Sequence, residues 1–213
     1  MQFTELQVHT ALIVGEQKVS DGSIVKSRGM KDGSTAVTVL RGKYTEASQR
    51  GHMFFSYCAA RAMSLPATAQ IGNIIWNPPE SGVYLALGPW SAQIQVTSAG
   101  NFGVSLAYTA QAITPTTATV ANSTGSCNLN ASSPNLSKAK AYAIGTLLVA
   151  PTVVMNLFHS TEGIATTGVD QMGGDFEGLF VVSPGYVVCL AAYVAAIAAV
   201  GFTSTLTWEE IPA

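Results

Sequence analysis

The chain has 213 residues, of which 48% are hydrophobic and only 10% are charged, and its net charge is -2. Ordinary soluble domains carry about 25% charged residues, so a surface this poor in charge favours burial against lipid or against other protein subunits. The small net charge gives no overall attraction to nucleic acid or to an anionic membrane. The length allows one large domain, or one domain with an arm.

The few charges are unevenly placed along the chain. Residues 1–61 hold eight of the ten basic residues and five acids, whereas residues 62–213 hold two basic residues and seven acids. From Ser81 to Ser137 no residue is charged. The basic segment is either simply solvated or attaches to an acidic partner surface. The candidate attachment residues are Lys18, Lys26, Arg28, Lys31, Arg41, Lys43 and Arg50.

Cysteine usage and the first residues bear on where the protein folds. The three cysteines, Cys58, Cys127 and Cys189, are widely spaced and fit neither a zinc pattern nor a dense disulfide framework, so we expect buried free thiols. The stretch MQFTELQVHTALIVG lacks the positive and long apolar regions of a secretion signal. We therefore expect synthesis and folding in a cytoplasm.

The N-terminal third predicts little regular structure. Residues 1–43 alternate short apolar groups with Gly, Asp, Ser and Lys, which is typical of an arm ordered on another surface. Residues 44–51, YTEASQRG, predict a brief helix with Thr45 as N-cap and Gly51 at its end. Residues 52–63 are ambiguous, because the aromatic content favours a strand whereas AARAM favours a helix, and we prefer the strand.

After Pro66 the pattern becomes one of short strands separated by turn signals. Residues 71–76 and 83–87 predict strands on either side of the turn NPPESG. The clearest pair is SAQIQVT (91–97) with FGVSLAYT (102–109). Period-two alternation on both sides of a Gly/Asn turn predicts a hairpin with one buried face.

The following residues continue this pattern. Residues 113–137 are polar and uncharged and predict a long surface loop, with 117–121 as a possible short strand. The acidic, glycine-rich residues 168–178 also predict a loop. Further strands are expected at 143–149, 153–159, 176–182 and 201–208.

One uncharged stretch, YVVCLAAYVAAIAAVGF (186–202), could be read as a membrane anchor. It is short for a spanning helix, which needs about 20 residues, and no Lys or Arg follows Lys140 as a positive anchor. A buried helix is one alternative because alanine favours helix. We prefer a central strand over 186–195, buried on both faces, and a turn at 196–200. Such a strand also suits a subunit interface, with candidate residues Tyr186, Val188, Leu190 and Tyr193.

Motifs that carry chemistry are missing from the sequence. It contains no GxSxG, GxxxxGK[ST], GxGxxG or HExxH pattern, so we predict no enzyme, catalytic residue, metal site or cofactor. Asp170, Asp175 and Glu177 could gather around calcium, but their spacing is not that of an EF-hand and a solvated acidic loop is simpler. Few basic residues with few aromatics among them argue against a nucleic-acid groove.

The three tryptophans have two possible roles. Trp76, Trp90 and Trp208 could stack on sugar rings. Each lies at the end of a predicted strand, however, where packing in the core is expected.

Many short strands, regular turn signals and weak helix content predict an all-β protein. We expect an antiparallel β-sandwich, jelly-roll-like, over residues 63–213. An irregular N-terminal arm with one short helix would occupy residues 1–62.

Three stretches in this charge-poor β-rich chain resemble small accessory virion proteins of tailed bacteriophages. GKYTEASQRGHMFF (42–55) resembles the Y-x-E-A-x-x-R-G stretch of phage structural proteins. SPGYVVCLAAY (183–193) places a Pro-Gly turn before the penultimate strand, and LTWEEIPA (206–213) resembles the L-T-W-E-E-x-P ending. The resemblance implies a jelly-roll head decoration (cement) protein or a fibre or spike component, usually trimeric. Its N-terminal part would attach to the capsid or tail, and no catalytic residues come with it.

The first hypothesis is therefore a homotrimeric decoration protein of the virion, made in the host cytoplasm. Its partners would be other copies of itself and the major capsid protein, with no nucleic acid, membrane or cofactor. The second hypothesis is a fibre or spike module that binds host-surface glycan through Trp or Tyr on the loops rich in Asn, Ser and Thr. A small β-sandwich hydrolase is the third.

Overall fold

The chain divides into two units, Met1–Lys43 and Tyr44–Ala213. The computed structural model describes residues 16–18, 24–26, 28–29, 35–36, 44–59, 63–96, 102–120, 126–160, 168–194 and 201–213. In the first unit, β1 (Glu16–Lys18) pairs antiparallel with β2 (Ile24–Lys26). Likewise, β3 (Arg28–Gly29) pairs antiparallel with β4 (Thr35–Ala36).

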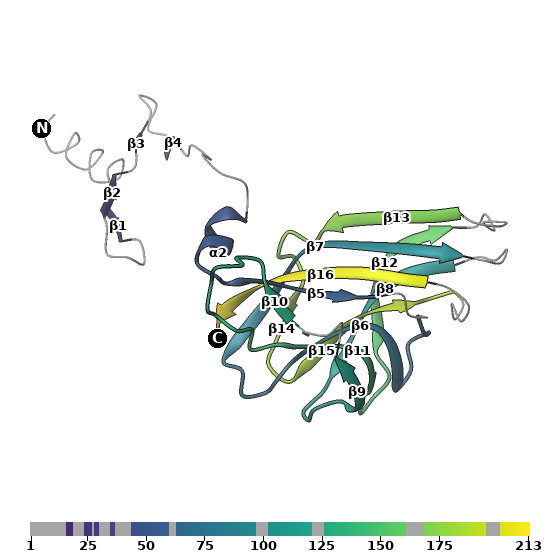
Figure 1. Ribbon diagram of the computed structural model, residues 1–213. Helices are drawn as coiled ribbons and strands as arrows, with labels where there is room; N and C mark the ends of the chain where they lie inside the picture. Colours follow the sequence, from purple (N-terminus) through teal and green to yellow (C-terminus); the bar gives the residue numbers. More distant parts are fainter. Residues whose placement is uncertain are drawn as a thin grey trace, which may run out of the picture. The chain divides into compact units, whose positions relative to one another are not determined.

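The second unit is a sandwich of two antiparallel sheets, so the all-β fold class is confirmed (Figure 1). The first sheet has the order β10 (Ser126–Asn128), β5 (Met53–Cys58), β16 (Gly201–Pro212), β7 (Val83–Val96) and β13 (Gly168–Asp175), and β14 (Val181–Val182) also pairs with β7. The second sheet has the order β12 (Thr152–Ser160), β8 (Phe102–Ala110), β15 (Tyr186–Ala192), β6 (Ala69–Asn77), β11 (Lys140–Thr146) and β9 (Thr116–Val120).

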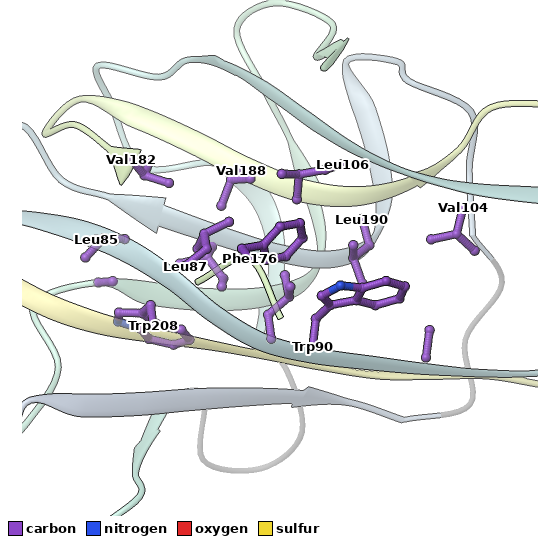
Figure 2. Close-up of a cluster of buried hydrophobic side chains, with 14 of the residues drawn as sticks. Leu85, Leu87, Trp90, Val104, Leu106, Phe176, Val182, Val188, Leu190 and Trp208 are labelled. Atoms are coloured by element: carbon purple, nitrogen blue, oxygen red, sulfur yellow. The ribbon is translucent and has the colours of Figure 1, made fainter. Parts of the chain in front are cut away.

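Side chains from both sheets fill the core between them (Figure 2). Leu85 and Leu87 of β7 and Trp208 of β16 belong to the same cluster as Val188 and Leu190 of β15, and all five are fully buried. Each such burial stabilises the fold by roughly 1.5–3 kcal/mol relative to exposure. The strand predicted at 201–208 is therefore confirmed, and the alternation of its residues reflects one face on this core.

The central strand expected over 186–195 is confirmed as β15. Val187, Cys189 and Ala191 on its other face are also fully buried, in a second cluster with Trp76 and Tyr142. Burial on both faces explains why the stretch lacks alternation. The turn expected at 196–200 lies outside the described residues.

The predicted short helix is present as α2 (Thr45–Gln49). Its N-cap is Tyr44 rather than Thr45, and no side chain caps the first turn. Gly51 ends the helix with φ +70°, a left-handed conformation that suits glycine. A Cβ at this position would lie 2.1 Å from Ser133 Oγ, so the space also requires glycine.

The division between the units differs from the one expected after residue 62. It falls between Lys43 and Tyr44, so α2 and β5 belong to the larger unit. The reason is that β5, the strand expected from the aromatic residues of 52–63, lies inside a sheet, between β10 and β16.

The hairpin predicted from residues 91–97 and 102–109 is wrong. β7 pairs with β16, β13 and β14, whereas β8 pairs with β12 and β15, so the two strands belong to opposite sheets. Val104 and Leu106 of β8 do face the core, as the alternation indicated, but Ser105 and Ala107 on the opposite face are buried as well.

A single strand, β7, replaces the two strands expected at 83–87 and 91–97. Its pairing with β16 shifts between Leu87↔Trp208 and Trp90↔Leu206, so Gly88 and Pro89 lie opposite one residue of β16. Such a bulge accommodates a proline, which has no N–H for the ladder. Thr207 Oγ1 donates a 2.6 Å hydrogen bond to the Pro89 carbonyl at this point.

The loop predicted at 168–178 is largely a strand, since β13 pairs with β7 over its whole length. The strand predicted at 176–182 is reduced to β14, because Glu177 and Gly178 adopt positive φ and turn the chain. The strands expected at 143–149 and 153–159 are found as β11 and β12. The loop expected at 113–137 contains β9, as suggested, and also β10.

Candidate functional site

The strand proposed for a subunit interface lies in the interior of its sheet. β15 pairs with β8 on one side and with β6 on the other. Val188 and Leu190 are fully buried in the core of the monomer, so they cannot form a subunit contact. Tyr186 is 38% exposed, and Tyr193 is half-buried. Of the four candidates, only these two tyrosines at the ends of the strand reach the surface.

β12 forms the edge of the same sheet, two strands away from β15. Among the described strands it pairs only with β8, which leaves the hydrogen-bonding groups of its other side without a strand. Val153, Val154 and Met155 are 37%, 44% and 39% exposed on this strand. No residue from 141 to 161 is charged. Edge strands are usually protected from pairing by charge or proline, and β12 itself has neither.

Two bulges shape this edge. The pairing with β8 shifts between Val153 and Met155 and again between Asn156 and Phe158, which makes Val154 and Leu157 the extra residues. Bulges bend an edge strand and redirect its side chains. They limit regular strand addition along all nine residues of β12.

An aromatic pocket of about 350 Å³ lies beside β12. Tyr108 of β8 and Tyr186 stack with their ring centroids 6.3 Å apart, and the Phe180 ring meets Tyr108 edge-on at 6.1 Å. Val154 lines the pocket, together with Val181, which is 48% exposed. The apolar surface of the edge is therefore continuous with a concave aromatic site.

Tyr193 lies at the opposite end of β15, also next to β12. Its ring is 5.7 Å from the ring of His159 on β12. Gly103 on β8 makes room for it, because a Cβ there would approach the Tyr193 ring to 2.2 Å. The two tyrosines proposed from sequence, Tyr186 exposed and Tyr193 half-buried, thus flank the edge, although the edge itself was not identified.

Of the predicted attachment residues, the structure describes the side chain of Arg50 alone. Lys18 lies on β1, Lys26 on β2 and Arg28 on β3, and their side chains lie outside the described part of the structure. Lys31, Arg41 and Lys43 lie outside the described residues altogether. Arg50 follows α2, and its guanidinium forms an ion pair with Glu46 one helical turn earlier.

The tryptophans are buried, as predicted, and offer no sugar platform, but Trp90 and Trp208 lie inside β7 and β16 rather than at strand ends. Trp76, Trp90 and Trp208 are all buried, at 3%, 9% and 0% exposure. The outer face of the first sheet instead has a shallow groove of about 180 Å³ that contains no charged residue. Its lining residues are Tyr57, Ser91, Ala92, Gln93, Gln171, Thr203, Ser204 and Thr205.

Titratable groups are sparse in the described part of the chain, where no three His, Cys, Asp or Glu residues gather as metal ligands would. Asp175 Oδ1 accepts hydrogen bonds from the Tyr44 hydroxyl and from the Glu177 backbone N–H, at 2.6 and 2.8 Å. Cys58 and Cys189 are buried and Cys127 is half-buried, largely as expected. Burial raises the pKa of the Cys189 thiol to about 12.

No described helix has the length and hydropathy needed to cross a membrane.

Comparison with known proteins identifies no relative: no family model, no curated protein and no solved structure matches the chain. The sequence contains one indication of this surface, the uncharged residues 141–161 with their adjacent valines. That these residues lie at the edge of a sheet depends on the order in which the strands pair, which the sequence does not reveal.

Proposed function

We propose that this chain is a structural virion protein, an oligomeric decoration (cement) protein of jelly-roll type that binds the outside of a phage capsid and stabilises it. Its function would reside in interfaces rather than in a catalytic centre. The observation that carries the self-assembly part of the proposal is the uncharged, apolar edge formed by β12 and the adjoining aromatic pocket. The phage assignment rests on the resemblance at residues 42–55, 183–193 and 206–213.

Apolar surface that extends over a strand and a pocket favours association with another copy. Leu148 and Val149, just before β12, are 52% and 58% exposed, and Leu179 beside β14 is 81% exposed. Large contiguous apolar patches on a folded domain commonly mark interaction sites. Burial of this surface between copies would also explain how a chain with 10% charged residues stays dispersed.

The proposed assembly is a homotrimer, and this number rests on the resemblance. A ring of three is closed by a heterologous contact, in which the edge of one copy meets a different surface of the next. The basic N-terminal unit, with six basic and four acidic residues, would attach to an acidic surface of the major capsid protein.

The test uses the full chain and phage heads assembled without it. Light scattering coupled to gel filtration should give the mass of a trimer, and the heads should bind the protein and resist heating better. A monomer with no affinity for heads would refute the proposal.

The second candidate is a fibre or spike module that binds host-surface glycan, and the uncharged groove on the first sheet favours it. Tyr57 is 39% exposed and can stack on a sugar ring, while Gln93 and Gln171 offer amide donors and acceptors to hydroxyl groups. A glycan array separates the candidates, because a purely cementing protein should give no signal.

A further inference from the structure

A second pocket, of about 450 Å³, lies around the C-terminal part of β16 and is distinct from the assembly edge. Its volume lies in the range of ligand-binding sites, which combine apolar walls with a few polar groups. The residues that line it are Gly51, His52, Phe54, Val83, Pro134, Asn135, Leu136, Lys138, Glu210 and Pro212.

The polar centre of this pocket is the carboxylate of Glu210, a residue that is only 8% exposed. Its Oε1 atom accepts three hydrogen bonds: 2.6 Å from Ser137 Oγ, 2.8 Å from the Lys138 N–H and 3.2 Å from the Ala139 N–H. These contacts fix the carboxylate and hold the segment before β11 against β16. One oxygen is therefore fully used by the fold.

The other oxygen, Oε2, has no partner within the described part of the structure. Asn77 Oδ1 and Trp208 Nε1 also lack a hydrogen-bond partner, but they are inaccessible to solvent, whereas part of the surface of Oε2 is accessible. Since Glu210 lines the pocket, Oε2 is the carboxylate atom available to a ligand there.

The charge of Glu210 is not neutralised by a cation of the described residues. Their ion pairs include none with this carboxylate, although Lys138, whose side chain is exposed, also lines the pocket. A charge that is largely removed from water is normally paired. The larger unit as a whole carries eight acidic and four basic residues, which also favours a cationic ligand.

The apolar walls of the pocket determine what kind of stem the ligand can carry next to its charged group. Phe54, Val83, Leu136 and two prolines surround the carboxylate with hydrocarbon, and Leu136 is 86% exposed at the rim. Such walls suit an alkyl stem that carries its charge at one end. The pocket therefore has complementary regions for a charged head and an apolar stem.

We propose that this pocket binds an ammonium or guanidinium group on a short hydrocarbon stem, with Glu210 Oε2 as the acceptor. The same chemistry occurs in small free amines and in lysine or arginine side chains of a partner polypeptide. In either case the head would donate a charge-assisted hydrogen bond to Oε2, and the stem would contact Phe54, Val83 and Leu136.

The matched variants are Glu210→Gln and Glu209→Gln. The first keeps an Oε1 acceptor for the three donors and replaces Oε2 with an amide, which cannot accept. The second removes the same charge from the neighbouring, half-buried residue that does not line the pocket. Thermal unfolding of each variant verifies that the fold is kept.

The experiment is a nuclear magnetic resonance titration of the full chain with four cationic probes and a neutral one. The probes are butylammonium, butylguanidinium and capped tripeptides centred on lysine or arginine, with a norleucine-centred tripeptide as the neutral control. We expect saturable shifts at His52 and Leu136 with cations, and a loss of affinity of about tenfold or more in E210Q but not in E209Q. Binding of the free cations alone would identify a small amine as the ligand, and tighter binding of the peptides would identify a partner side chain.

Failure of all four cations to bind the wild type, or equal affinity in E210Q, would overturn the proposal. If E210Q does not fold, Lys138→Met decides instead. It removes a like charge from the rim and leaves the hydrogen bonds of Glu210 intact, so cation affinity should rise several-fold, and an unchanged affinity would count against the site.

Discussion

The Ser56 hydroxyl donates a 2.6 Å hydrogen bond to Asn73 Oδ1 and thereby joins the two sheets inside the core. Ser56 lies on β5 of the first sheet and Asn73 on β6 of the second, and both are fully buried. The Asn73 amide also donates to the carbonyls of Ser56 and Ser204, at 3.4 Å each. One side chain on β6 thus satisfies groups on two strands of the first sheet, β5 and β16.

Replacing Asn73 should be costly for this reason. We expect Asn73→Leu to lower the free energy of unfolding by about 2–3 kcal/mol, because it leaves the buried Ser56 hydroxyl without its acceptor and removes two amide hydrogen bonds between the sheets. Ser56→Ala should cost less, and the double variant should cost less than the sum of the two. Denaturation in urea measures all three, and an Asn73→Leu variant as stable as the wild type would contradict this role.

A charge on the assembly edge should prevent association without unfolding the monomer. Val154→Lys puts an ammonium group at the aromatic pocket, where burial between copies would leave it unpaired, so we expect a shift toward monomer. Leu129→Lys is the control, since Leu129 is 44% exposed and follows β10 at the edge of the first sheet, whereas β12 belongs to the second. Gel filtration with light scattering measures both. An oligomeric V154K protein would place the interface elsewhere, whereas a monomeric wild type would refute assembly itself.

Alkaline pH should destabilise the protein through Cys189. Burial raises the pKa of this thiol from 9.0 to about 12, so the neutral form is favoured in the folded state. The resulting stability is fully present below pH 9 and is lost as the pH rises toward 12. We expect Cys189→Ala to remove this part of the decline in the free energy of unfolding, measured by urea denaturation across that range.

Burial also raises the pKa of Tyr142, and the Tyr142→Phe variant separates its contribution from that of the thiol. If C189A and the wild type lose stability equally over this range, the thiol is not the group responsible.

Two glycines with positive φ separate two costs of a Gly→Ala substitution, the steric clash of the added Cβ and the unfavourable backbone conformation. A Cβ at Gly72, on β6, would lie 2.4 Å from the Leu190 carbonyl oxygen on β15, so Gly72→Ala requires the two strands to separate. At Gly82, with φ +67°, a Cβ meets nothing within 4 Å. We expect G72A to lower the free energy of unfolding by about 1–3 kcal/mol and G82A by clearly less. Thermal denaturation that ranks them in the opposite order would contradict this packing.

Sequence patterns predicted individual strands where the order of apolar and polar residues depends only on which faces of the strand are buried. Residues 201–208 alternate because β16 has one face on the core, and residues 186–192 do not because β15 is covered on both. Pairing could not be predicted in the same way. The short connection after β7 suggested a hairpin, yet the chain passes there to the opposite sheet. Alternation reports which face is buried and not which strand lies beside it.

The candidate sites show the same limit. Val188 and Leu190 are interface candidates because a strand buried on both faces suits a subunit contact, but an interior strand uses such residues for the core. Tyr186 and Tyr193 lie at the surface because they end the strand. The exposure of β12 follows from strand order, and the acceptor geometry of Glu210 follows from contacts with residues more than 70 positions away.

The position of β16 has a consequence for biosynthesis. It follows every other described strand in the sequence, yet it lies between β5 and β7. A nascent chain therefore cannot form the middle of the first sheet until residues 201–212 have left the ribosome, at about 5–20 residues per second. Until then β5 and β7 have no common neighbour, and the edges that pair with β16 are free. The middle of the first sheet is thus the last described part of the sandwich that can form during synthesis.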